Sequence, residues 1–243
     1  MKKPDVSLFF PVYRDEKTVE IVATKAIAVL KEVAADYEVI IVDDGSPDRS
    51  GEIADRLARG NPAISVVHHP RNLGYGAAIK SGFAKARCEW ICFTDGDDEY
   101  DVGDLHKLIA LRDFYDLIIT FRYVKTYSSD RQFISWVYNS LLRMLFRTPY
   151  RDISTGLRLI RKSLIDQIRS YSNSPFIGAE ITIKAMLKGY RIGEVGIQTF
   201  PRQFGQGAST SMPNILATIR DMMAVYQTIF SPGYELPPNR PRR

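Results

Sequence analysis

The sequence has few of the residues that build disulfide or metal scaffolds. It contains two cysteines among 243 residues. Cys88 and Cys92 stand in an apolar run, where free cysteines usually pack as small hydrophobic side chains. No further pair exists to form a disulfide framework or a zinc motif. This usage favours a reducing, cytosolic setting.

Long apolar runs and linkers are also missing. No run approaches the roughly 20 residues that a bilayer-spanning helix needs. The first residues, 1–5, lack the apolar core of a signal peptide. We therefore expect a soluble or peripheral protein with one catalytic domain over residues 1–211. An amphipathic helix and a Pro/Arg-rich tail are expected over residues 212–243.

Two common nucleotide-binding motifs are absent. The segment Asn72-Leu73-Gly74-Tyr75-Gly76 resembles a phosphate loop, but it lacks the third glycine of G-x-G-x-x-G and a following Gly-Lys-Ser/Thr. These gaps disfavour a dinucleotide site and a P-loop. The glycines are expected to allow tight entry of the backbone into a helix.

Charge is unevenly distributed along the chain. The net charge is +5, but residues 1–120 carry −6 and residues 121–243 carry +11. Such an asymmetry suggests an anionic partner for the second half: phosphates, a membrane surface or nucleic acid.

Hydrophobic periodicity predicts alternating strands and helices. Apolar runs predict strands over residues 6–10, 38–42, 64–68, 90–94 and 117–121, with a short one within 192–200. Helical spacing covers residues 18–35, 75–87, 105–111, 133–146, 178–188 and 214–230, and a helix ending near residue 59. This alternation predicts an α/β fold, a mostly parallel Rossmann-like sheet with helices on both faces and amphipathic C-terminal helices.

Polar clusters follow three of the predicted strands. They are residues 11–16, 43–46 and 95–99. In open parallel sheets, ligands bind beyond the carboxyl ends of the strands. The three clusters are therefore expected to converge on one binding edge.

Asp95, Asp97 and Glu99 form the most acidic of these clusters. Alternate residues of an extended segment share a side, so the three carboxylates can face together, with Asp98 pointing away. Mg²⁺ or Mn²⁺ would relieve their repulsion and act as a Lewis acid on a diphosphate. The alternative is a solvated acidic loop that opens the helix near residue 103.

The segment 43–48 offers both a ligand and turn chemistry. We assign Asp44 to ligand binding and Asp48 to capping of the following helix. Tyr13, after the first strand, could stack on a base or simply pack.

Together these motifs resemble a known family. Pro11-Val12-Tyr13, Val42-Asp43-Asp44-Gly45-Ser46-Pro47-Asp48, Arg71-Asn72-Leu73-Gly74-Tyr75-Gly76-Ala77-Ala78 and Asp95-Gly96-Asp97 occur in the order and at the intervals of family 2 inverting glycosyltransferases with the GT-A fold. Phe121-Arg122-Tyr123-Val124 and Asp152-Ile153-Ser154-Thr155-Gly156-Leu157-Arg158 resemble the dolichol- and polyprenyl-phosphate sugar synthases. The resemblance covers roughly residues 5–210.

The resemblance implies a set of site residues. Those implied for the nucleotide sugar are Pro11, Tyr13, Asp15, Val42, Asp44, Asp95, Gly96, Asp97, Arg122 and Arg202. Those implied for the metal are Asp95, Asp97 and Glu99, and those for an acceptor phosphate are Arg122, Arg131, Ser135 and Arg202. Arg14-Asp15-Glu16 departs from the family's Asn-Glu, so either Asp15 or Glu16 can take that role.

The function implied is transfer of a hexose from GDP-mannose or a UDP-sugar to a polyprenyl or dolichyl phosphate. Catalysis would use Asp97, Arg122 and Asp152 with Mg²⁺ or Mn²⁺. A glycan hydroxyl acceptor is the alternative, and it needs a carboxylate base, for which Asp152 and Glu180 are candidates. The basic, aromatic stretch 133–147 either lies on a membrane surface or packs into the core.

The expected partners are thus a nucleotide-sugar donor, a lipid phosphate and the cytoplasmic face of a membrane, with self-association or a membrane-protein partner also open. A nucleic-acid-binding module is disfavoured for two reasons. The aromatics fall in apolar helical patterns, and acidic strand ends would repel a polyanion.

Overall fold

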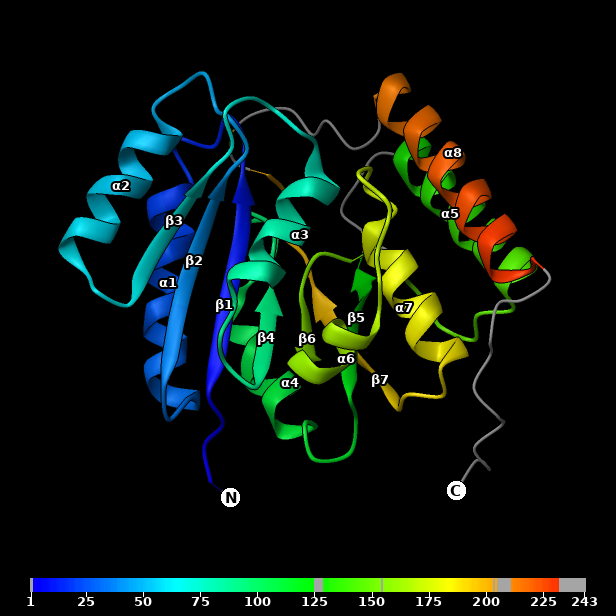
Figure 1. Cartoon of the computed structure of the whole chain (residues 1–243), viewed down its shortest axis with the longest axis horizontal. Coiled ribbons are helices and arrows are strands. Elements are labelled where there is room, and N and C mark those ends of the chain that lie inside the picture. The colour runs from blue at the N-terminus through cyan, green and yellow to red at the C-terminus, as the bar shows by residue number, and fades with distance from the viewer. Residues whose placement is uncertain (1, 125–128, 154, 203, 205–210, 232–243) are drawn as a thin grey trace.

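A seven-stranded sheet forms the centre of the part of the chain that the structure describes (Figure 1). The computed structural model describes residues 2–124, 129–153, 155–202, 204 and 211–231, with only the backbone of residues 124 and 129–131. The strand order is β3-β2-β1-β4-β6-β5-β7. The strands are β1 (Val6–Val12), β2 (Tyr37–Asp43), β3 (Ile64–His68), β4 (Trp90–Phe93), β5 (Leu117–Val124), β6 (Arg158–Arg161) and β7 (Ile192–Gln198).

Six of these strands match the predicted ones, and the α/β expectation is confirmed. β6 was not predicted, and it runs antiparallel to both β4 and β5. Its sequence, Arg-Leu-Ile-Arg, has only two apolar residues between charged ones, which is too short a pattern to identify. Arg158 is nevertheless buried, because its guanidinium donates to the carbonyls of Ile153 and Thr155 at 2.6 and 2.9 Å.

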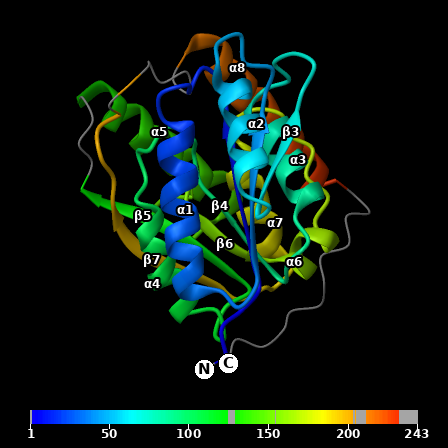
Figure 2. The same ribbon diagram turned by 90° about the vertical axis from the view of Figure 1, so that its left-hand side faces the viewer.

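One face of the sheet is covered by helices from the first half of the chain. These are α1 (Val19–Val33), α2 (Ser50–Gly60) and α4 (Leu105–Ala110), preceded by the 3₁₀ turn η1 (Val102–Asp104). Alternate β1 residues, among them Leu8 and Phe10, point into this layer, whereas Phe9 points into the other. Figure 2 views the sheet from its β3 edge, with α1 on one side of the strands and α3 on the other.

The second face is covered by α3 (Tyr75–Lys85), α5 (Ser129–Phe146), α6 (Lys162–Gln167), α7 (Ile177–Leu187) and α8 (Met212–Ile229). α5 and α8 lie side by side at the end of the molecule far from α2 (Figure 1), where the rings of Phe146 and Tyr226 are 5.8 Å apart. The predicted C-terminal helices are thus confirmed. Among the described residues, none of the helices has the length and apolarity to cross a bilayer. The division at residues 211 and 212 stays a prediction.

The register of the parallel strands brings the predicted polar clusters to one edge. Val12 at the end of β1 pairs with Asp43 at the end of β2, and Phe9 pairs with Phe93 at the end of β4. Beyond the last pairs, the Asp44 amide donates to the Val12 carbonyl at 3.0 Å. The N-terminus lies at the opposite end of the sheet (Figure 1). The residues after each strand are therefore neighbours in space.

Candidate active site

An acidic cluster that forms ion pairs with one arginine follows the end of β4. Asp97 and Glu99 are 8% and 4% exposed. The guanidinium of Arg202 pairs with both carboxylates, contacting Asp97 and lying 3.3 Å from Glu99. The chain after β7 reaches this position because the Phe200 amide donates to the Glu99 carbonyl at 2.9 Å. Burial lowers the pKa of Arg202, but the two carboxylates outweigh it and raise that pKa overall.

Asp95 faces the same cluster from the other side. The Tyr75 hydroxyl donates to its Oδ1 atom at 2.7 Å. Burial, followed by repulsion from Asp97, raises the pKa of Asp95 to about 7. Burial and the Asp95 charge also raise the pKa of Tyr75 well above its ordinary value, so its hydroxyl is a donor at neutral pH. The cluster therefore holds more negative charge than Arg202 neutralises.

The other two residues of the segment have different roles. Asp98, in a left-handed conformation with φ of 60°, turns to Lys25 on α1 at 2.8 Å, in agreement with the expectation that it points away. The Gly96 carbonyl accepts from the Thr18 hydroxyl at 2.7 Å. A Cβ at Gly96 would lie 3.0 Å from Val12 and closer still to the Pro11 carbonyl. Only glycine fits between β1 and the acidic cluster without displacement.

After β1, Asp15 and not Glu16 faces the cluster. Burial raises the pKa of Asp15 to about 6 against the lowering effect of the Tyr13 amide, which donates at 3.0 Å, and Asp97 raises it further. Glu16 instead accepts from the Arg49 amide at 3.3 Å. The Tyr13 side chain is 38% exposed at this edge, so its ring is accessible to a ligand.

After β2, Asp44 is fully engaged by the protein. Its Oδ1 atom accepts from His69 at 2.6 Å and from the Leu73 amide at 2.9 Å, and its Oδ2 atom accepts from the Gly74 amide at 3.0 Å. Val42 is completely buried in the core behind it. The expected nucleoside contacts of Asp44 and Val42 therefore stay predictions, and in this structure Asp44 holds the 69–74 loop.

Asp48 stands one residue before the N-cap of α2, which is Arg49, so the prediction that Asp48 is the cap is wrong by one residue. Its Oδ1 atom accepts from the Ser50 amide at 3.1 Å and from the Ser50 hydroxyl at 2.6 Å. This contact supports the first turn of the helix.

Arg122 and Asp152, both predicted to be catalytic, form a buried ion pair. The Nε and Nη2 atoms of Arg122 lie 2.8 and 2.6 Å from Asp152 Oδ2. Their side chains are 9% and 3% exposed. Arg122 lies in the last residues of β5, near its carboxyl end, so the pair continues the sheet edge that carries the acidic cluster.

The predicted acceptor residues on α5 are less defined. Ser135 lies in the second turn, where its carbonyl accepts from the Asn139 amide group at 3.0 Å. The side chain of Arg131 lies outside the described residues. Their contact with a lipid phosphate stays a prediction.

Glu180, suggested as a base for a hydroxyl acceptor, is not accessible to a substrate in this structure. Glu180 is completely buried and lies 2.5 Å from the Lys184 ammonium. It also accepts from the backbone amides of Tyr171 and Ser172, each at 2.9 Å. All of these partners belong to the protein, so the carboxylate ties α7 to residues 171–172.

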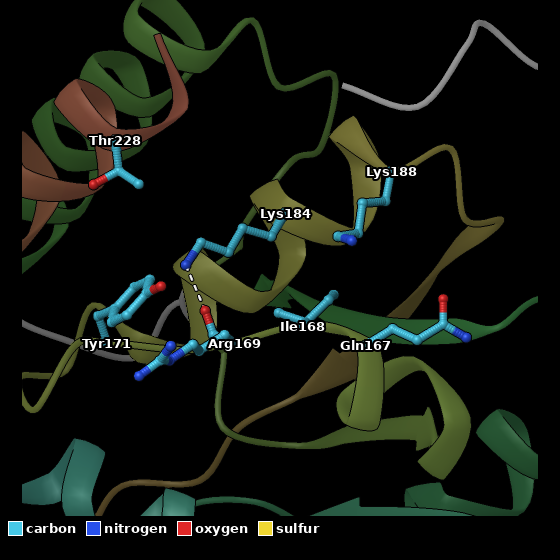
Figure 3. Close-up of a pocket in the computed structure, with 7 residues that line it drawn as sticks. All are labelled: Gln167, Ile168, Arg169, Tyr171, Lys184, Lys188 and Thr228. Atoms are coloured by element: carbon cyan, nitrogen blue, oxygen red, sulfur yellow. Dashed lines mark hydrogen bonds between the residues drawn. The ribbon is translucent and has the colours of Figure 1, made fainter. Parts of the chain in front are cut away.

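A hollow elsewhere on the molecule does not contain the predicted site. It has a volume of about 260 Å³ and lies between α6, α7 and α8 (Figure 3). The lining residues are Gln167, Ile168, Arg169, Tyr171, Lys184, Lys188 and Thr228. Lys184 is already paired with Glu180 and donates to the Arg169 carbonyl at 2.7 Å (Figure 3).

The sequence model of glycosyl transferase family 2 matches residues 7–169, which include β1 to β6 and the acidic cluster. The chain belongs to glycosyl transferase family 2. The family recognised from the sequence motifs is thereby confirmed.

Three curated proteins are similar to this chain. Glycosyltransferase AglD of Haloferax volcanii is 28% identical over 82% of this chain and 33% of its own length. Dodecaprenyl-phosphate galacturonate synthase of Rhizobium johnstonii is 26% identical over 96% and 69%. Undecaprenyl-phosphate 4-deoxy-4-formamido-L-arabinose transferase of Pseudomonas fluorescens is 28% identical over 66% and 48%. The chain thus spans only part of each relative.

Solved glycosyltransferases share the fold. Glucosyl-3-phosphoglycerate synthase of Mycobacterium tuberculosis, in complex with Mn²⁺, UDP and phosphoglyceric acid, has a TM-score of 0.71 over 92% of this chain and 78% of its own. The same enzyme with UDP-glucose has a TM-score of 0.72 over 92% and 80%. The identities, 17% and 16%, establish a common GT-A-like fold and no more.

Sequence reasoning missed three side chains at this site. His69 holds Asp44, Tyr75 holds Asp95, and Lys25 holds Asp98. Tyr75 and Lys25 lie on helices α3 and α1, where the hydrophobic periodicity predicts which residues are buried but not which polar groups they contact. Their roles depend on how α1 and α3 pack against the sheet edge, which no local pattern encodes.

Proposed function

We propose that this family 2 glycosyltransferase moves a hexose from a nucleoside diphosphate sugar to a polyprenyl phosphate at the cytoplasmic surface of a membrane, with a divalent cation. The observation that carries the proposal is that one edge of the sheet presents acidic side chains next to basic ones. The carboxylates of Asp95, Asp97 and Glu99 follow the end of β4, and the guanidinium of Arg202 lies beside them. The guanidinium of Arg122 lies near the end of β5. Two of the relatives are named for transfers that involve dodecaprenyl or undecaprenyl phosphate.

The residues at the end of β4 fit a divalent cation. They offer only carboxylate oxygens, the ligands that Mg²⁺ and Mn²⁺ prefer. The raised pKa of Asp95, caused by burial and then by Asp97, marks excess negative charge that a cation would relieve. Across the described residues, no group of three or more His, Cys, Asp or Glu side chains is arranged to hold a metal. Asp95 and Asp97 together with substrate phosphates are sufficient, since Mg²⁺ is usually bound by one or two carboxylates.

The protein's part in the reaction is positioning and charge. When bound, the cation supplies Lewis acidity to the leaving diphosphate. Arg202 can transfer from Asp97 to a phosphate, because guanidinium binds carboxylate and phosphate with the same fork. A phosphate oxygen of the acceptor, anionic near neutral pH since its second pKa is about 6, attacks the anomeric carbon in line. The glycosidic bond forms as the bond to the nucleoside diphosphate breaks, with inversion.

A glycan hydroxyl is the less favoured acceptor. It would need a carboxylate base. Glu180 is buried against Lys184, and Asp152 is paired with Arg122. The engagement of both suggested bases favours an acceptor that arrives already ionised.

The paired helices α5 and α8 support a location at a membrane surface. Large apolar side chains are exposed along both, namely Phe133, Ile134, Trp136, Met144, Met212, Leu216, Ile219 and Met223. Arg143 and Arg220 are exposed on the same two helices. Exposed apolar groups beside cations are typical of helices that lie in the interface of anionic membranes.

A panel of donors and acceptors tests the proposal. UDP- and GDP-sugars are supplied with Mn²⁺, with polyprenyl phosphate or with soluble sugars as acceptors. We expect sugar-labelled lipid from one class of donor. Transfer to soluble sugars and never to lipid phosphate would contradict the acceptor, and turnover that survives chelation would contradict the metal.

A further inference from the structure

The loop that enters α3 connects two of the strand ends. Its backbone is held on one side by Asp44, which accepts from the Leu73 and Gly74 amides at 2.9 and 3.0 Å. From the next residue, the Tyr75 hydroxyl reaches Asp95 at 2.7 Å. Residues 73–75 therefore join the end of β2 to the end of β4.

The loop has little freedom to move. Gly74 has a φ of 96°, a conformation that L side chains rarely adopt. The Gly76 amide donates to the Asn173 carbonyl at 2.9 Å, and a Cβ at Gly76 would lie 2.6 Å from the backbone at Ser172 and Asn173. The Tyr75 side chain thus leaves a backbone that is fixed on both sides.

Asp95 is confined between two neighbours. The Tyr75 hydroxyl bonds its Oδ1 atom, while Gly156 lies so close to Oδ2 that a Cβ there would collide with the carboxylate and come within 2.8 Å of the Tyr100 ring. Within the part of the chain that the structure describes, the hydroxyl of Tyr75 is the one hydrogen-bond donor to this carboxylate. Its removal would leave the carboxylate free to rotate toward the space that the hydroxyl occupied.

We propose that Tyr75 is a positioning residue that fixes the Asp95 carboxylate toward the metal and diphosphate of the donor. The inference rests on the proposed function, which makes Asp95 a ligand of that group. Partners that orient the ligands of a metal typically contribute 10- to 100-fold in affinity or activity. The link from Asp44 through Tyr75 to Asp95 also means that the loop orients both ends of the donor site together.

The test is Mn²⁺ binding, measured by electron paramagnetic resonance, in the presence of saturating UDP or GDP. Tyr75→Phe removes a single oxygen, and we expect it to weaken Mn²⁺ binding about 10-fold. The KM for the donor rises with it, whereas the KM for polyprenyl phosphate does not change. Tyr190→Phe is the matched control, because the Tyr190 hydroxyl donates to Gln167 at 2.6 Å away from the cluster. It should leave Mn²⁺ binding unchanged.

A second variant approaches Asp95 from the opposite side. Gly156→Ala places a methyl group against Oδ2, and it should weaken Mn²⁺ binding in the same way while the Tyr75 hydroxyl remains present. Wild-type Mn²⁺ affinity in folded Tyr75→Phe would overturn the inference and leave the proposed function standing. Failure of the wild-type protein to bind Mn²⁺ with either nucleotide would instead overturn the proposed function, and the inference with it.

Discussion

Arg202 partly neutralises the negative charge of the acidic cluster. In this structure it pairs with Glu99 and with Asp97, a carboxylate that the proposed metal would also use. A guanidinium and a cation compete for the same oxygens until a nucleotide supplies phosphates for the guanidinium. The arginine therefore has opposite effects on metal binding before and after the donor arrives.

Arg202→Gln separates these effects. We expect the variant to bind Mn²⁺ more tightly than wild type without nucleotide, because Asp97 loses its competitor. Turnover should fall by about 100-fold, in line with the loss of one donor that stabilises developing charge. Arg87→Gln, which removes an arginine paired with Asp36 at 2.8 Å elsewhere on the surface, controls for loss of charge. Weaker Mn²⁺ binding by Arg202→Gln without nucleotide would contradict this account.

Asp95 and Asp15 predict how stability depends on pH. Their pKa values are about 7 and about 6 in the folded protein, and the ordinary value is 3.8. Between about pH 4 and pH 7 the folded state binds more protons than the unfolded state, so its stability falls as pH rises. Urea unfolding of chelator-treated protein should show this fall, and Asp95→Asn should flatten it. A pH dependence of stability that is the same in Asp95→Asn as in wild type would contradict the raised pKa of Asp95.

At the scale of single elements, α7 is held by a charge pair with no access to substrate. Glu180→Gln leaves the Lys184 ammonium buried without its carboxylate, and breaking one side of such a pair costs about 3–5 kcal/mol. The free energy of unfolding in urea should fall by this amount, while kcat of the folded variant stays near wild type. Glu52→Gln, at a position 76% exposed, should change neither. Loss of kcat without loss of stability would restore Glu180 as a base.

The α5–α8 surface makes a prediction about membranes. The rings of Phe133 and Trp136 stack at 6.0 Å and are 63% and 60% exposed. Replacing both with serine should lower binding to anionic vesicles at least 10-fold, since burial of each such side chain contributes about 1.5–3 kcal/mol. Phe114→Ser, which changes a ring 61% exposed next to α4, is the control. Equal vesicle sedimentation of both variants would exclude this surface.

Elements with strong periodicity were predictable, and those formed by tertiary contacts were not. The five strands of the first half and the amphipathic helices follow from apolar runs that local burial requires. β6 has only Leu159 and Ile160 to mark it, and its place between β4 and β5 depends on pairing with distant strands. In the site, the acidic residues after β4 were predictable from their position. The contacts of Tyr75 and Arg202 were not, because each joins residues 20 or more positions apart.

At the scale of the whole molecule, one edge of the sheet combines acidic side chains from the first half of the chain with basic side chains from the second half. The −6 half of the chain supplies the carboxylates after β1, β2 and β4, and the +11 half supplies Arg122 and Arg202. In the sheet, β6 from the second half of the chain lies between β4, from the first half, and β5, which spans the boundary between the halves. The acidic and basic side chains therefore lie along the edge of one continuous sheet. This arrangement suits a reaction between two phosphorylated substrates.

The most direct test is metal-dependent glycosylation of polyprenyl phosphate by the wild-type protein and by Asp97→Ala. With its preferred nucleotide sugar and Mn²⁺, the wild type should form the lipid-linked sugar, and chelation should abolish that product. Asp97→Ala should lose at least about 100-fold in turnover while its unfolding transition remains cooperative. Equal product from the wild type with and without chelator, or wild-type turnover by Asp97→Ala, would contradict the assignment of this edge as the catalytic site.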